Sequence, residues 1–183
     1  YDGKGVKQSH EMAKMLYELA AQQGEVSAMY NLGVMYKNGQ GVEQSYERGV
    51  EYYEQAAQLG LASAQYNLAN LYKGGKGVKQ SFLMTKELYE LAIEQGHVGA
   101  IVGLGVLYVT GSGVEKDIVK ARDLWIKAEA LGDENATTYL KILDDKEREN
   151  AALDPTTIVC SFCGLPETET RNFSKTKCPC KST

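Results

Sequence analysis

The chain repeats itself every 36 residues, and this period constrains its fold more than any other feature. The segment 26–61 returns as 62–97 and again as 98–133. Glycine, alanine, leucine and tyrosine keep the spacing, at Gly24, Gly60, Gly96 and Gly132, at Ala28, Ala64, Ala100 and Ala136, at Leu32, Leu68, Leu104 and Leu140, and at Tyr36, Tyr72 and Tyr108. Composition alone does not align so many residues on one period, so the sequence predicts an array of similar units.

Each unit is predicted to be an antiparallel pair of helices. Small and apolar residues recur at three- and four-residue spacing in its first half, which places them on one helix face, as with Ala28, Leu32, Gly33 and Tyr36. Paired glycines then break this helix. A second helix is predicted to follow an N-cap residue at Ser9, Ser45, Ser81 or Asp117, and to end at a glycine such as Gly60.

Small residues at fixed positions predict that the two helices approach closely. They are Gly33, Ala69 and Gly105 in the first helix and Ala56, Ala92 and Ala128 in the second, beside a bulky position held by Tyr17, Tyr53, Tyr89 and Trp125. One such hairpin cannot bury both of its faces, whereas stacked hairpins share a continuous core. The predicted fold is therefore all-α, an α-solenoid of 36-residue helix-turn-helix repeats.

The repeat sets the predicted domain boundaries. Residues 1–25 are a partial repeat containing a loop and a second helix, and three whole repeats follow at 26–61, 62–97 and 98–133. Residues 134–150 begin another first helix, but Lys141 and Asp144 replace its small and aromatic positions, so this segment is predicted to cap the array. A linker at 151–159 leads to a cysteine-rich segment at 160–183.

The repeated pattern A-x-x-x-L-G-x-x-Y, G-x-G-V and A-A-x-x-G resembles the Sel1-like repeat, a relative of the tetratricopeptide repeat with a longer loop between its helices. Ala69 departs from the family's usual glycine, and Val102-Gly103 replaces the Tyr-Asn of the other copies. The resemblance covers residues 1–143. It implies an adaptor that scaffolds protein complexes and has no chemistry of its own.

All four cysteines lie beyond the array, at Cys160, Cys163, Cys178 and Cys180. Their paired spacing is typical of zinc ligands. The motif resembles the start of a MYND-type zinc finger, which implies that the first pair serves one zinc and the second pair another, although the second pair is one residue closer than usual. A single four-cysteine zinc site is the alternative. Neither site of the family type would be complete within 160–183.

Composition excludes several other classes. The net charge is −4, and neither the array nor the cysteine-rich segment has the basic excess of a duplex-binding surface, so nucleic acid is not an expected partner of the array. No apolar run approaches the roughly 18 residues of a membrane span. We expect an intracellular protein, cytoplasmic or nuclear. Because Tyr1 is not an initiator methionine, we expect the native N-terminus to lie before this sequence, and entry into the secretory pathway stays open.

A partner-binding groove is predicted on the first helices, opposite their core-facing side. At 100° per residue this side carries Ser27, Tyr30, Val34, Lys37, Tyr66, Asn70, Lys73, Val102, Val106 and Val109. These groups suit an extended peptide or a helix, and in related solenoids the same side lines the concave surface. The alternative is that Tyr30, Tyr66 and Val102 only pack against the first helix of a neighbouring repeat.

No catalytic residue is predicted. The G-x-G loops lack the rest of a nucleotide-binding motif, and His97 is interpreted as a surface turn residue. The sequence therefore favours a protein or peptide adaptor with the zinc finger as a second interaction module. The alternatives are a regulatory subunit whose array only positions the finger, and an enzyme whose catalytic domain lies outside this chain.

Overall fold

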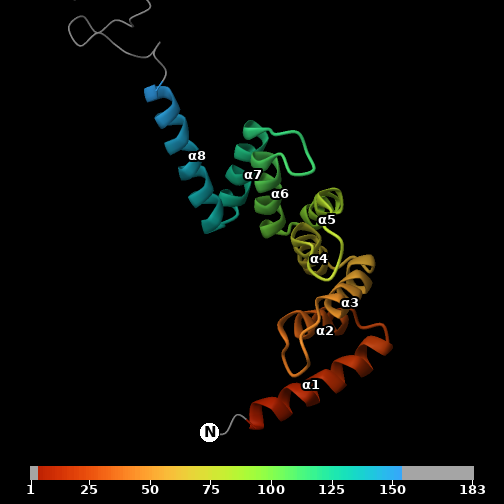
Figure 1. Cartoon of the computed structure of the whole chain (residues 1–183). Coiled ribbons are helices and arrows are strands. Elements are labelled where there is room, and N and C mark those ends of the chain that lie inside the picture. The colour runs from red at the N-terminus through yellow and green to blue at the C-terminus, as the bar shows by residue number, and fades with distance from the viewer. Residues whose placement is uncertain (1–3, 154–183) are drawn as a thin grey trace, which may run out of the picture. The chain divides into compact units, whose positions relative to one another are not determined.

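The computed structural model describes residues 4–153, with side chains from residue 9 to residue 150, as a succession of helices (Figure 1). In this part of the chain there are eight helices and no strand. The helices are α1 (Lys4–Gln22), α2 (Val26–Asn38), α3 (Tyr46–Gln58), α4 (Ala62–Gly74), α5 (Phe82–Glu94), α6 (Val98–Thr110), α7 (Ile118–Ala130) and α8 (Glu134–Leu153). The predicted zinc-finger segment, 160–183, lies outside the described residues.

The helices up to Ala136 form one unit, and the chain from Thr137 onward forms a second. Within the first unit, the main contacts join each helix to the next along the chain, from α1 to α7. The pairs α2–α3, α4–α5 and α6–α7 are the three predicted hairpins. The all-α solenoid expected from the 36-residue period is therefore confirmed.

The close approach within each hairpin is visible at the small residues. A Cβ atom added at Gly33 would lie 2.7 Å from the ring of Tyr53, and one at Gly105 would lie 2.9 Å from Cδ1 of Trp125. Tyr53 is fully buried and Trp125 nearly so. Each ring therefore occupies the space that a side chain on the facing helix would need.

A left-handed glycine lets the loop after α4 lie close to the start of α3. Gly77 has φ +69°, and an added Cβ would lie 2.5 Å from the backbone nitrogen of Glu47 at the start of α3. This loop thus lies directly against the preceding repeat. The helix-ending Gly60 also has a left-handed backbone, with φ +87°, as its position predicts.

Three of the four predicted N-caps are confirmed. The side chains of Ser45, Ser81 and Asp117 each accept a hydrogen bond from the backbone N–H three residues later. The prediction for Ser9 is wrong, because α1 already begins at Lys4. The backbone N–H of each observed cap bonds a tyrosine carbonyl of the preceding helix, as Ser45 does to Tyr36 at 2.9 Å.

The helix predicted over 134–150 is α8, which extends to Leu153. The side chain of Asp133 accepts a 3.0 Å hydrogen bond from the backbone N–H of Ala136, which caps its first turn. Its role as the cap of the array stays a prediction.

Candidate functional site

The ten predicted groove residues lie on three successive first helices, α2, α4 and α6. Ser27 is exposed, and Val102 is buried with 9% of its surface exposed. The other eight are half-buried. Nine of the ten therefore present some surface to solvent, and Val102 belongs mainly to the core.

Two of the groove tyrosines also link successive hairpins. The hydroxyl of Tyr30 on α2 accepts a 3.2 Å hydrogen bond from Nδ2 of Asn67 on α4. The ring of Tyr66 on α4 stacks on that of His97, the N-cap of α6, with centroids 4.5 Å apart. Tyr30 and Tyr66 therefore contribute to packing between hairpins, as the alternative expected, while each keeps some surface exposed to solvent.

His97 is not a surface turn residue, and that interpretation is wrong. It is half-buried and is the N-cap of α6, where Nδ1 accepts a hydrogen bond from the backbone N–H of Ala100 at 3.3 Å. Burial lowers the pKa of its imidazole below the usual 6.5. The sequence contained a signal for this cap, because Asp133, a good capping residue, holds the equivalent position one repeat later.

Asn70 is held firmly in the groove. Its Oδ1 accepts a 2.7 Å hydrogen bond from the hydroxyl of Tyr89, and its Nδ2 donates to the carbonyl of Tyr66 at 3.0 Å. One repeat later, Trp125 donates instead to the carbonyl of Val102 at 3.1 Å. The amide at position 70 thus gives the hydroxyl of Tyr89, which is packed beneath it, a hydrogen-bond acceptor.

Four predicted groove residues, Lys37, Tyr66, Asn70 and Lys73, line a single cleft of about 570 Å³. The cleft lies between the C-terminal ends of α2 and α4 and includes Gln44, Tyr46 and Lys76 from the adjoining loops and the start of α3. Three lysines line it, and no aspartate or glutamate does. We call it the lysine cleft.

Hydrogen bonds from glutamines tie the loops to the helix ends that carry two of these lysines. Nε2 of Gln44 donates to the carbonyl of Lys37, and Nε2 of Gln80 donates to the carbonyl of Lys73, both at 2.8 Å. The ammonium of Lys76 lies 5.5 Å from the centroid of the Tyr46 ring. Within residues 9–150, no carboxylate lies within 4.0 Å of the ammonium of Lys37, Lys73 or Lys76. The cleft therefore presents positive charge on an ordered framework.

The prediction from sequence missed Gln44, Tyr46 and Lys76. Gln44 and Tyr46, which belong to repeat 26–61, face the groove of the next repeat, and Lys76 lies in the loop that follows α4. The positions equivalent to Lys76 are Lys4, Gln40 and Ser112, so the repeat pattern gave no signal for it.

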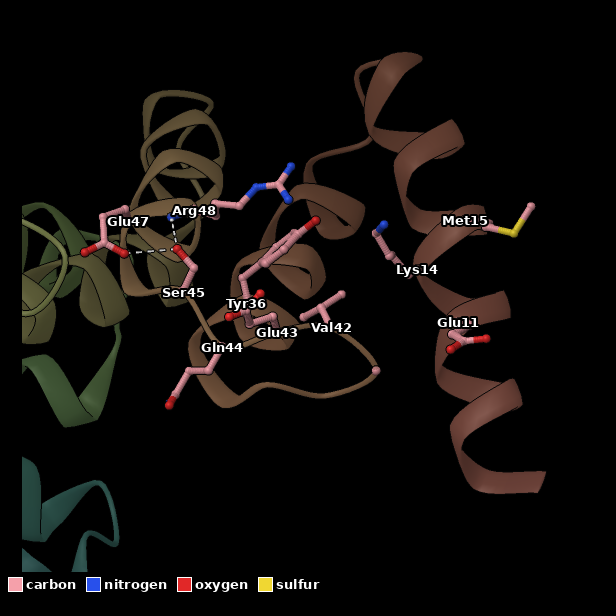
Figure 2. A pocket seen from close by; sticks show the side chains of 11 residues that line it. Glu11, Lys14, Met15, Tyr36, Val42, Glu43, Gln44, Ser45, Glu47 and Arg48 are labelled. Carbon is pink, nitrogen blue, oxygen red and sulfur yellow. Dashed lines mark hydrogen bonds between the residues drawn. The ribbon is translucent and has the colours of Figure 1, made fainter. Parts of the chain in front are cut away.

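A second cleft, of about 580 Å³, lies between α1 and the loop that follows α2 (Figure 2). Figure 2 shows Lys14 of α1 pointing toward the loop that carries Val42. Its charged residues are of both signs, with Glu11, Glu43 and Glu47 beside Lys14 and Arg48. Its cations already have partners, because Lys14 pairs with Glu18 at 3.3 Å and the Arg48 guanidinium lies 4.3 Å from the centroid of the Tyr36 ring. This cleft is therefore the weaker candidate.

The model of the Sel1 repeat matches residues 1–25, 26–61, 62–97 and 98–133, in register with the observed hairpins. The chain belongs to the Sel1 repeat family. Sel1 repeats generally mediate interactions between proteins. No curated protein matches the chain.

Solved structures share this Sel1 repeat fold. A protective antigen of uropathogenic Escherichia coli strains is 37% identical, with a TM-score of 0.69, over 72% of this chain and 28% of its own. A Sel1 repeat protein from Oxalobacter formigenes is 31% identical, with a TM-score of 0.70, over 76% and 57%. Cysteine rich protein B of Helicobacter pylori is 25% identical, with a TM-score of 0.56, over 75% and 99%. The matched region thus spans under two thirds of the first two relatives.

A membrane-spanning helix and a metal-binding cluster are both absent from the part of the Sel1 repeat chain that the structure describes. No helix there is long and apolar enough to cross a membrane. No group of three or more His, Cys, Asp or Glu side chains there is arranged to hold a metal ion.

Proposed function

We propose that this Sel1 repeat chain is an adaptor that binds a protein or peptide in the groove on α2, α4 and α6. One observation carries the proposal: four residues chosen from helical spacing alone line one cleft of about 570 Å³. The side chains of Lys37 and Lys73 in that cleft have no ion-pair partner among residues 9–150. Positive charge without an ion-pair partner is a feature expected of a recognition surface.

The groups that line the lysine cleft also favour a binding role over a catalytic one. The lysine cleft contains amide, phenol and ammonium groups, with no carboxylate, histidine or thiol to act as base or nucleophile. Asn70 and Asn67 are fixed by hydrogen bonds to tyrosines, so the surface is preorganised. Preorganisation lowers the entropy lost on binding and thereby favours affinity.

Site-specific photo-crosslinking tests this proposal without assuming what the partner is. A photoreactive amino acid is placed at the exposed Asn38, which lines the cleft beside the lysines, and, as a matched control, at the exposed Glu87 on α5. Both proteins are irradiated in an extract of the native source, and crosslinked proteins are identified by mass spectrometry. We expect a specific product at position 38 that is absent at position 87. Equal products at both positions, or none at 38, would contradict the proposed groove.

The cysteine-rich segment is proposed as a second interaction module. Cys160, Cys163, Cys178 and Cys180 lie outside the described residues, and the proposal rests on the chemistry of the donor set. Four thiolates in two close pairs suit the tetrahedral coordination that zinc prefers. Native mass spectrometry of the chain and of its Cys160→Ser variant tests this. A bound zinc that the variant loses would support the proposal, and a chain without zinc after refolding with the metal would contradict it.

A further inference from the structure

The composition of the lysine cleft specifies the chemistry of its ligand. Its charged residues are Lys37, Lys73 and Lys76, three positive charges without an acidic neighbour in the lining, on a chain whose net charge is −4. Lys37 and Lys73 each lie in the last turn of a helix, where a cation stabilises the helix dipole. That effect does not explain Lys76, which follows the C-cap Gly75. The ammonium of Lys76 lies 5.5 Å from the centroid of the Tyr46 ring, and a negatively charged ligand in the cleft would meet all three ammonium groups.

The groove changes character one repeat further along. The positions of Asn70 and Lys73 on α4 become Val106 and Val109 on α6, and both valines are half-buried. The groove thus passes from cationic on α2 and α4 to aliphatic on α6. A ligand that lies across these helices meets positive charge at one end and apolar surface at the other.

Side-chain contacts link the first helices along the groove. The hydrogen bond between Tyr30 and Asn67 links α2 to α4, and the stacking of Tyr66 on His97 links α4 to the N-cap of α6. An extended chain advances about 3.3–3.6 Å per residue. A short extended segment that crosses the groove can therefore meet the lysines of α2 and α4 and then the valines of α6.

We infer that the groove binds an extended segment of a partner protein in which a short acidic cluster and a short aliphatic cluster are adjacent, with the acidic cluster in the lysine cleft and the aliphatic cluster over Val106 and Val109. This inference rests on the proposed function and adds the chemical class of the partner. Carboxylates would pair with Lys37, Lys73 and Lys76, and the preorganised amide of Asn70 lies beside them.

Fluorescence polarisation with defined peptides tests the inference. The probes are fluorescein-labelled peptides with the sequences Glu-Glu-Glu-Ala-Ile-Val and Val-Ile-Ala-Glu-Glu-Glu, which cover both chain directions. In the first control the glutamates are replaced by glutamine, and in the second Ile and Val are replaced by serine. We expect one acidic probe to bind the whole chain about tenfold more tightly than either of its controls, and its affinity to fall as salt is added.

A pair of variants locates the binding. K37Q/K73Q removes two positive charges from the cleft, and K79Q/K116Q removes two from exposed loop positions outside it. We expect the first variant to weaken binding at least about fivefold and the second less than about twofold. Lys37 and Lys73 are half-buried and Lys79 and Lys116 are exposed, so circular dichroism spectra are recorded to check that both variants fold.

Several results would overturn the inference. They are equal binding of the glutamine control, equal loss in both variants, or tighter binding of a fluorescein-labelled oligothymidine, which would indicate a nucleic-acid ligand instead. If neither acidic probe binds while position 38 still crosslinks a protein, the inference fails and the proposed function stands. If position 38 also crosslinks nothing, both fail.

Discussion

The hydroxyl of Tyr89 donates a 2.7 Å hydrogen bond to Oδ1 of Asn70, whereas the equivalent hydroxyl of Tyr53, one repeat earlier, has no partner among the described residues. Both tyrosines are fully buried. The difference follows from the groove position above each ring, which is Asn70 in one repeat and Val34 in the other. One position thus affects both the surface of the groove and the stability of the core.

This pair predicts opposite effects of the same substitution. Tyr89→Phe should lower the free energy of unfolding by about 1–2 kcal/mol, because Oδ1 of Asn70 loses its donor. Tyr53→Phe should leave that free energy unchanged or raise it by up to about 1 kcal/mol, because it removes a buried hydroxyl without a partner. Urea unfolding followed by circular dichroism measures both. Equal losses in the two variants would show that the Asn70 bond contributes nothing.

The contact between Gly105 and Trp125 predicts a steric effect. Gly105→Ala should destabilise the chain by about 1–3 kcal/mol, because the added methyl would overlap the indole ring. Gly74→Ala is the matched control, since its Cβ would be 3.6 Å from the nearest atom, the Cγ of Lys76, and the backbone there is helical. The control should be neutral or slightly stabilising. A harmless Gly105→Ala would mean that the hairpin can open to admit a methyl group.

Alanine substitutions at two left-handed glycines distinguish the cost of backbone strain from the cost of a steric clash. Gly60→Ala should cost about 1–2 kcal/mol from its positive φ alone, because nothing lies within 4 Å of the added atom. Gly77→Ala has a similar φ, and its Cβ would also collide with the backbone at Tyr46 and Glu47, so it should cost more. Urea unfolding of the two variants shows which one loses more free energy of unfolding. The reverse order would contradict the contact between this loop and the preceding repeat.

His97 makes stability depend on pH. Its pKa in the folded chain lies below 6.5 because burial disfavours the charged imidazolium, so the unfolded chain binds the proton more readily. The stability that His97 contributes is therefore fully present above pH 6.5 and decreases as the pH falls from there through the folded pKa. Protonation of Nδ1 would also remove the acceptor for the N–H of Ala100.

The matched variant for this prediction is His97→Asn, which keeps an N-cap acceptor but does not titrate. Free energies of unfolding are measured at pH 7.5 and pH 5.5. We expect the wild type to lose more stability than the variant between these two values. An equal loss in both proteins would mean that His97 does not sense pH.

The sequence predicts the solenoid and much of the groove because both depend on periodicity. Leu32 and its equivalents repeat at 36 residues, and 100° per residue separates Lys37 from the core face without any knowledge of contacts. Tyr66 and His97 show the limit of that method. They stack on each other between α4 and the N-cap of α6, and a helical period within one helix does not describe such a contact.

The loop residues were missed for a related reason. Gln44 and Lys76 enter the lysine cleft because left-handed glycines fold each loop back on neighbouring structure. Ser9 lies within α1, whereas the backbone N–H of each observed cap bonds a tyrosine carbonyl of the preceding helix. The contacts of these loops and caps come from neighbouring elements rather than from the local sequence.

The location of the bound peptide tests the central claim most directly. We would add the unlabelled acidic and aliphatic peptide to the chain labelled with nitrogen-15 and follow the backbone amide signals by NMR. The account predicts shifts confined to the ends of α2 and α4, the adjoining loops and α6, with the largest near Lys37, Asn70 and Lys73. Shifts centred instead on Glu11 and Arg48 in the second cleft, or spread evenly over the helices, would contradict it.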